Sequence, residues 1–188
     1  KTSQPSSGGG GGGGGDRSSS SRKHTLTLDG FVSTADLIVD GSGKVKSSVQ
    51  LKTGDGKIIL DIPQGTVLKD ADGAALKSIS ASPASSPPDP PAGNDILIQY
   101  DFGPDGAVFI PNLTLTFNYD PTDLPEGAVE EGISIAYWNG SQWVTLPGQI
   151  DREAKSISAK IAHFSQYALM AALPPAESET VSAAPGTT

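Results

Sequence analysis

Short runs of alternating apolar and polar residues fill the middle of this chain. The clearest runs are residues 58–62, 113–117 and 133–137. A period of two residues places successive side chains on opposite faces of a strand, whereas an amphipathic helix has a period of 3.6. Clusters of Gly, Asp, Pro and Asn separate about eleven such runs, and no run has the helical period. The pattern predicts an all-β fold, an antiparallel β-sandwich of about ten to eleven short strands.

The same alternation predicts the core of the sandwich. Every second residue of the three clearest runs is apolar, so one face of each strand should be buried. The expected core residues, which should form facing layers, are Ile58, Leu60, Ile62, Leu113, Leu115, Phe117, Ile133, Ile135 and Tyr137.

The chain divides by composition into three parts. Residues 1–22 form a Ser/Gly-rich arm with an unbroken glycine run at 8–15, and residues 173–188 are small, polar and Pro-containing. Such segments have high backbone entropy and little apolar surface to bury, so we expect a flexible arm and a flexible tail or linker. Residues 23–172 are predicted to form one β-sandwich domain.

The charge and the absence of cysteine exclude several classes of function. The chain has 13 Lys+Arg against 21 Asp+Glu, a net charge of −8, and no basic run. This composition argues against nucleic-acid binding and against docking on an anionic membrane. Without cysteine there is no thiol chemistry and no thiolate metal site. No apolar stretch approaches the length of about 20 residues that a membrane-spanning helix needs.

The sequence predicts no metal or cofactor. Its two histidines, His24 and His163, are too few for a multi-histidine site. Calcium is the metal considered, with oxygen ligands from residues 70–73 or from Asp101 and Asp105, but the spacing of a calcium loop is missing. Turn-forming Asp-Gly pairs account for these clusters.

Two pairs of carboxylates could in principle act as the acid and base of a glycosidase. They are Glu130 with Glu131, and Asp120 with Asp123. Both lie in or beside the Pro/Gly-rich connection 121–132, where solvated carboxylates are ordinary. We expect no multiple-turnover catalysis there.

Two tryptophans, Trp138 and Trp143, flank the turn at residues 139–142, and Tyr137 precedes them. One hypothesis is a carbohydrate-binding platform on which these rings stack against a sugar. The alternative is that the rings cover an edge of the core. Sugar binding requires exposed and roughly coplanar rings.

Three segments between residues 57 and 117 resemble the ZU5 family, a β-sandwich of surface and scaffolding proteins. Residues 61–66 (DIPQGT) match its strand and "Ile-Pro-x-Gly" turn, and residues 100–109 (YDFGPDGAVF) match its "Gly-Pro-x-Gly-x-x-Phe" hairpin. The alternating strand 113–117 follows. The resemblance implies a sandwich fold and a surface or scaffolding role.

Residues 135–170 resemble the self-cleaving region of GAIN domains and of autoproteolytic ZU5 domains. The resemblance rests on residues 136–143 (AYWNGSQW) and 156–170 (SISAKIAHFSQYALM), in which a His-Phe-Ser tripeptide lies between the last two strands. The chain departs from the GAIN pattern because it lacks the cysteines that brace the turn there.

The chemistry that this resemblance implies is a single self-cleavage. His163 would take the proton of Ser165, whose hydroxyl would attack the carbonyl of Phe164, and water would hydrolyse the resulting ester. This requires a hydrogen bond between the base and the hydroxyl and a strained turn. The alternative is structural: His163 caps a turn, Phe164 packs in the core and Ser165 starts the last strand.

These features favour an extracellular structural or interaction module, a subunit of the cell surface or of a filament. Its expected partners are copies of itself, as a homo-oligomer or filament, or other surface proteins. Residues 23–28 include a strand that directly follows the flexible arm, so association by β-strand addition to a neighbour is predicted. The alternatives are a carbohydrate-binding module and an autoproteolytic maturation module.

Overall fold

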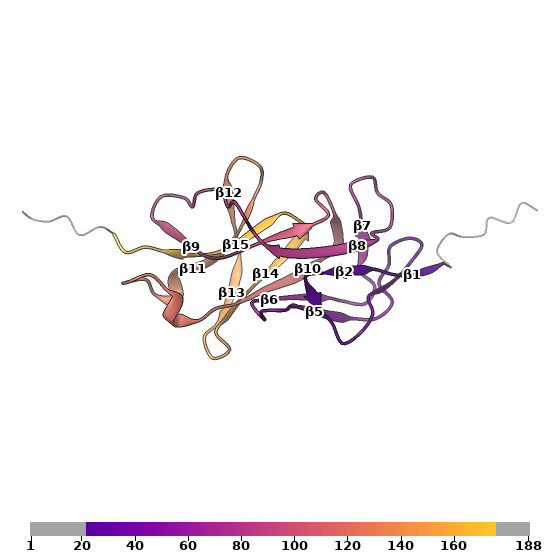
Figure 1. Ribbon diagram of the computed structural model, residues 1–188, viewed down its shortest axis with the longest axis horizontal. Coiled ribbons are helices and arrows are strands. Elements are labelled where there is room, and N and C mark those ends of the chain that lie inside the picture. The colour runs from indigo at the N-terminus through magenta and orange to yellow at the C-terminus, as the bar shows by residue number, and fades with distance from the viewer. Residues whose placement is uncertain (1–21, 176–188) are drawn as a thin grey trace, which may run out of the picture.

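The computed structural model describes residues 22–175, and these form an all-β domain (Figure 1). Two sheets pack face to face, and the only helical elements in the described part are the single-turn 3₁₀ helices η2 (Pro121–Asp123) and η3 (Glu130–Gly132). The predicted fold class is confirmed. Most of the predicted arm (residues 1–22) and tail (residues 173–188) lies outside the described residues, at 1–21 and 176–188.

One sheet has seven strands. In spatial order they are β13 (Gly148–Asp151), β14 (Ser156–His163), β10 (Val108–Asn118), β6 (Ile58–Ile62), β5 (Val49–Thr53) and β3 (Phe31–Val32), with β7 (Val67–Lys69) also paired to β10. The turn at residues 53–56 joins β5 and β6 as an antiparallel hairpin, as its Asp-Gly signal predicts.

The other sheet has six strands. In spatial order they are β12 (Trp143–Leu146), β11 (Ile133–Trp138), β15 (Gln166–Ala172), β9 (Asn94–Gly103), β8 (Ser78–Pro83) and β2 (Thr27–Asp29). Two further strands, β1 (Lys23–Thr25) and β4 (Ile38–Asp40), form a separate antiparallel pair beside the sheets.

The core lies between the two sheets. Of the nine residues expected there, all are buried except Tyr137, which is half-buried at the rim and packs against the core. The expected layers are only partly right, because β6 and β10 are hydrogen-bonded neighbours in one sheet. Only the β11 residues face them from the opposite sheet.

Strand β10 differs from the prediction because it runs through Pro111. The alternation suggested two strands, 107–110 and 113–119, separated near this proline. Before Pro111 the strand pairs with β7, beyond it with β6, and its register with β14 shifts between Val108 and Leu113. A proline that cannot donate to a ladder is tolerated at such an irregularity.

Residues 25–28, predicted as one strand, divide at Leu26. This side chain is buried, and its backbone N donates to the carbonyl oxygen of Leu37 at 2.9 Å. The division lets β1 pair with β4 while β2 pairs with β8. The β2–β8 pairing is parallel. The prediction of an antiparallel sandwich therefore fails for this one pair of strands.

A hydrogen bond between side chains links the two sheets at one end. The hydroxyl of Tyr100, on β9, donates to the carboxylate of Asp55 in the β5–β6 turn. Burial of the phenol and its bond to Asp55 raise the pKa of Tyr100 to about 12. The tyrosine therefore stays a neutral donor throughout the physiological pH range.

Candidate functional site

The His-Phe-Ser tripeptide carries the chain from one sheet to the other. His163 ends β14 in the seven-stranded sheet, and Gln166 begins β15 in the six-stranded sheet. The backbone N of Phe164 donates to the carbonyl oxygen of Ala107, and that of Phe102 donates to the carbonyl oxygen of Ser165, both at 3.1 Å. The segment from the end of β9 to the start of β10, which also crosses between the two sheets, thus holds this link on both sides.

A cleft of about 610 Å³ opens beside the link, between the ends of β9, β11 and β14. Its polar lining includes Asp101 on β9, Asp105 in the connection from β9 to β10, and His163 and Ser165 from the link. Both aspartates are exposed to solvent.

Phe164 belongs to the core. Its side chain is 1% exposed. The ring stacks on Phe102 with centroids 5.9 Å apart and meets Phe109 edge to face at 4.6 Å. Such aromatic pairs add to the stabilisation from area burial. The residue therefore anchors the link between the sheets, which is the structural role anticipated for it.

The imidazole of His163 contacts the ring of Tyr137 and lies close to the carbonyl group of Phe164. Its Nδ1 is 3.2 Å from the carbonyl oxygen of Phe164, and its ring meets that of Tyr137 edge to face at 4.9 Å. The hydroxyl of Tyr167 donates to the His163 carbonyl oxygen at 2.8 Å. Burial, and then the neighbouring Tyr137, raise the pKa of Tyr167.

The hydroxyl of Ser165 is engaged away from the histidine. It donates to the carbonyl oxygen of Trp138, at the end of β11, at 2.6 Å. Among the hydrogen bonds of the described residues, none joins His163 to Ser165. Neither Phe164 nor Ser165 has a positive φ; Lys155 is the one non-glycine described residue that does. The arrangement therefore has neither the base–hydroxyl contact nor left-handed backbone strain at this peptide.

The three aromatic residues considered for sugar binding do not form one platform. Trp138 and Trp143 are cross-strand partners with ring planes at 64°. Trp143 is half-buried on a small cluster with Met170, and its Nε1 donates to the carbonyl oxygen of Asp89 at 3.0 Å. Tyr137 packs instead against the main core. The Pro-rich loop that contains Asp89 thus covers part of this surface.

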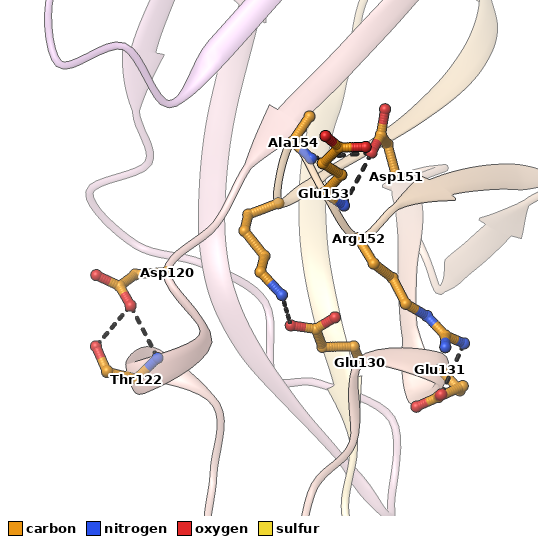
Figure 2. A network of polar contacts seen from close by, with 9 residues as sticks. Asp120, Thr122, Glu130, Glu131, Asp151, Arg152, Glu153 and Ala154 are labelled. Carbon is orange, nitrogen blue, oxygen red and sulfur yellow. Dashed lines mark hydrogen bonds and ion pairs between the residues drawn. The ribbon is translucent and has the colours of Figure 1, made fainter.

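The carboxylate pair at residues 130–131 is held by two cations of the β13–β14 turn (Figure 2). Lys155 Nζ lies 2.7 Å from Glu130 Oε1, and Arg152 Nη2 lies 2.6 Å from Glu131 Oε1. Asp120 caps η2 by accepting from the backbone N of Thr122 at 2.9 Å. These contacts give the carboxylates roles in fixing turns.

The aspartates considered for calcium also serve turns. Asp70 Oδ1 accepts from the backbone N of Asp72 at 3.1 Å and from that of Ala74 at 2.8 Å. Within residues 22–175, no three His, Asp or Glu side chains gather in a way that could hold a metal ion. No helix in this part of the chain is long and apolar enough to cross a membrane.

Sequence reasoning could not find the hydrogen-bond acceptors at this site. The carbonyl groups of Trp138 and Ala107 belong to the backbone, so residue type does not reveal them. No family model, curated protein or solved structure matches the chain. The ZU5 and GAIN resemblances of its motifs therefore stay predictions.

Proposed function

We propose that this chain is a structural module of an extracellular or cell-surface protein, connected to its neighbours through its two ends. The observation that carries the proposal is the position of these ends: β1 and the segment after β15 lie at opposite ends of the long axis (Figure 1). Chain ends of a domain often lie close together. Ends that point apart suit a module placed in series with others.

The contacts of the His-Phe-Ser link support the same role. Phe164 fills the core, and the Ser165 hydroxyl binds the end of β11. The acidic composition, with a net charge of −8, suits a soluble surface exposed to the medium.

Labelling of intact cells tests this proposal. An amine reagent that does not cross membranes should modify the protein on intact cells of its source, because lysines such as Lys52 and Lys77 are exposed to solvent. Labelling that occurs only after lysis would place the protein inside the cell and overturn the proposal. A cytoplasmic protein of the same cells serves as the control for leakage.

Association between copies would proceed by exchange of residues 23–29. In the described chain this segment pairs with β4 and β8 of its own molecule. Strand addition therefore requires that it leave these partners and occupy the same positions in a neighbour. A synthetic peptide of residues 22–32 should then dissociate assemblies seen by analytical ultracentrifugation, whereas a peptide with Leu26→Asp should not. Assemblies that resist the first peptide would exclude this route.

A second candidate function is self-cleavage, which the contact between His163 Nδ1 and the Phe164 carbonyl oxygen favours. A protonated Nδ1 would polarise the carbonyl that the Ser165 hydroxyl must attack. The hydroxyl would first have to leave the carbonyl oxygen of Trp138.

We expect the protein to show one intact mass, because the Ser165 hydroxyl donates to the carbonyl oxygen of Trp138 rather than to a base. Mass spectrometry under denaturing conditions checks this. Two masses that meet between Phe164 and Ser165 would establish self-cleavage, and a Ser165→Ala chain would then stay whole. In the intact case, Ser165→Ala should cost about 1 kcal/mol of unfolding free energy, since it removes one hydrogen bond.

A further inference from the structure

Strands β2 and β15 lie where tension between the two chain ends would enter and leave the domain. β2 follows β1 at the N-terminal end of the described residues, and β15 ends at Ala172, close to the other end. We propose that the domain is built to carry tension along the line between its two chain ends. β15 would hold the chain at one end, as the C-terminal grip, and β1 and β2 would hold it at the other, as the N-terminal grip. The inference rests on the proposed function and gives the module a mechanical task.

The directions of the strands set how such tension acts. β15 is antiparallel to β9, β9 is antiparallel to β8, and β8 is parallel to β2. β2 and β15 therefore run in the same direction along the six-stranded sheet. Tension at the N-terminal end of β2 and at the C-terminal end of β15 pulls the two strands in opposite directions along the sheet. Interstrand hydrogen bonds lie across the strands, so this shear strains a whole ladder at once.

The C-terminal grip is β15, which has a partner on each side. Seven of its residues pair with β9 and five with β11. Residues 167–171 are buried without interruption. For β15 to slide, both ladders must break together and this buried stretch must lose its packing.

The N-terminal grip is shorter. β1 pairs with β4 and β2 pairs with β8, over three residues each. Between them the Leu26 side chain is 3% exposed, and His24 Nε2 lies 3.0 Å from the carbonyl oxygen of Leu76. Each ladder here is single, whereas β15 has two, so we expect the domain to yield first at β1 and β2.

Pulling on single molecules in two directions tests the proposal. Because the chain has no cysteine, attachment cysteines can be placed freely in the full chain. Arg22→Cys with Leu173→Cys pulls along the proposed axis. Val129→Cys with Leu173→Cys shares one handle but pulls apart the adjacent ends of β11 and β15, where Ile133 faces Ala171. Val129 and Leu173 are 57% and 40% exposed, so the substitutions should leave the fold intact.

The unfolding force for the end-to-end pair should exceed that for the other pair by roughly twofold or more, since shear strains many bonds together and peeling strains one at a time. Equal forces, or a lower force from end to end, would overturn the proposal. The ratio belongs to the single domain, whereas the proposed function is tested on cells. A failure of the mechanical proposal can therefore be told apart from a failure of the proposed function.

A matched pair of variants locates the grip that yields first. Leu28 and Leu146 are both half-buried, both pack against the main core, and lie on the two edge strands of the same sheet, β2 and β12. Leu28→Ala should lower the end-to-end unfolding force, and Leu146→Ala should leave it unchanged. Chemical denaturation of both variants measures their loss of equilibrium stability. Equal losses of force in the two variants would overturn the assignment of the N-terminal grip.

Discussion

Replacing Phe164 with alanine should lower the free energy of unfolding by about 3–5 kcal/mol, the usual cost of removing a buried aromatic side chain. The ring is almost wholly buried and contacts Phe102 and Phe109 across the link between the sheets. A domain of this size is typically stable by only about 5–15 kcal/mol. Thermal unfolding should therefore show a midpoint lower by about 10 °C.

Phe164→Leu is the matched control for this prediction. Leucine keeps an apolar side chain in the core, so we expect a cost of about 1–2 kcal/mol. If the alanine variant were no less stable than the leucine variant, Phe164 would not anchor the two sheets. Circular dichroism during urea titration measures both free energies.

Asp40→Asn should lower the free energy of unfolding by about 2–3 kcal/mol, because a carboxylate that accepts several hydrogen bonds is lost. Asp40 is 5% exposed. Its Oδ1 accepts from the hydroxyl of Ser42 at 2.6 Å and from the backbone N of Lys44 at 3.1 Å, and its Oδ2 binds Lys46 Nζ at 2.9 Å. An amide nitrogen in this place would oppose one of these donors.

The same carboxylate should make stability depend on pH in the acid range. The Ser42 hydroxyl and then the Lys46 ammonium hold the pKa of Asp40 well below its usual value. An unfolded aspartate titrates near a pKa of about 3.9. Since the folded pKa is the lower one, the stabilisation is fully present above the unfolded pKa and is lost as the pH falls through the folded pKa. Urea titrations at a series of acid pH values should show a shallower decline for Asp40→Asn.

Asp120→Asn is the control for the Asp40 variant. Asp120 also accepts from a backbone N and a hydroxyl, both of Thr122, but it is exposed to solvent. Asparagine caps a helix about as well as aspartate does. The unfolding free energy of this variant should stay close to that of the parent chain. An equal loss in the two variants would mean that burial of Asp40 contributes nothing.

Local alternation was enough to predict most of the core and most strands of five or more residues, although not the continuity of β10 through Pro111. Ile58, Leu60 and Ile62 point inward because apolar residues recur at every second position of β6. The two-residue strand β3 and the three-residue strand β7 are too short for a period to be recognised. The parallel pairing of β2 with β8 joins Thr27 to Ser78, far apart in the chain. Nothing in either segment specifies the other.

At the candidate site, the sequence located the tripeptide but not its partners. The position of Phe164 in the core follows from its apolar side chain between two strands. The bond from Ser165 to Trp138 depends on how β11 and β15 are placed in the sheet, which local sequence does not encode. For the same reason the ion pair between Glu130 and Lys155 could not be foreseen from two carboxylates in a row.

The central place of β15 has a consequence for how the protein is made. Residues 166–172 form the last strand of the domain in chain order, yet they lie between β11 and β9. The six-stranded sheet therefore cannot close before β15 has been synthesised. In a nascent chain that stops short of Gln166, β11 and β9 each lack the partner strand that belongs between them. Both strands can pair fully only when β15 has been added. Folding of the six-stranded sheet is thus delayed until residues 166–172 have left the ribosome.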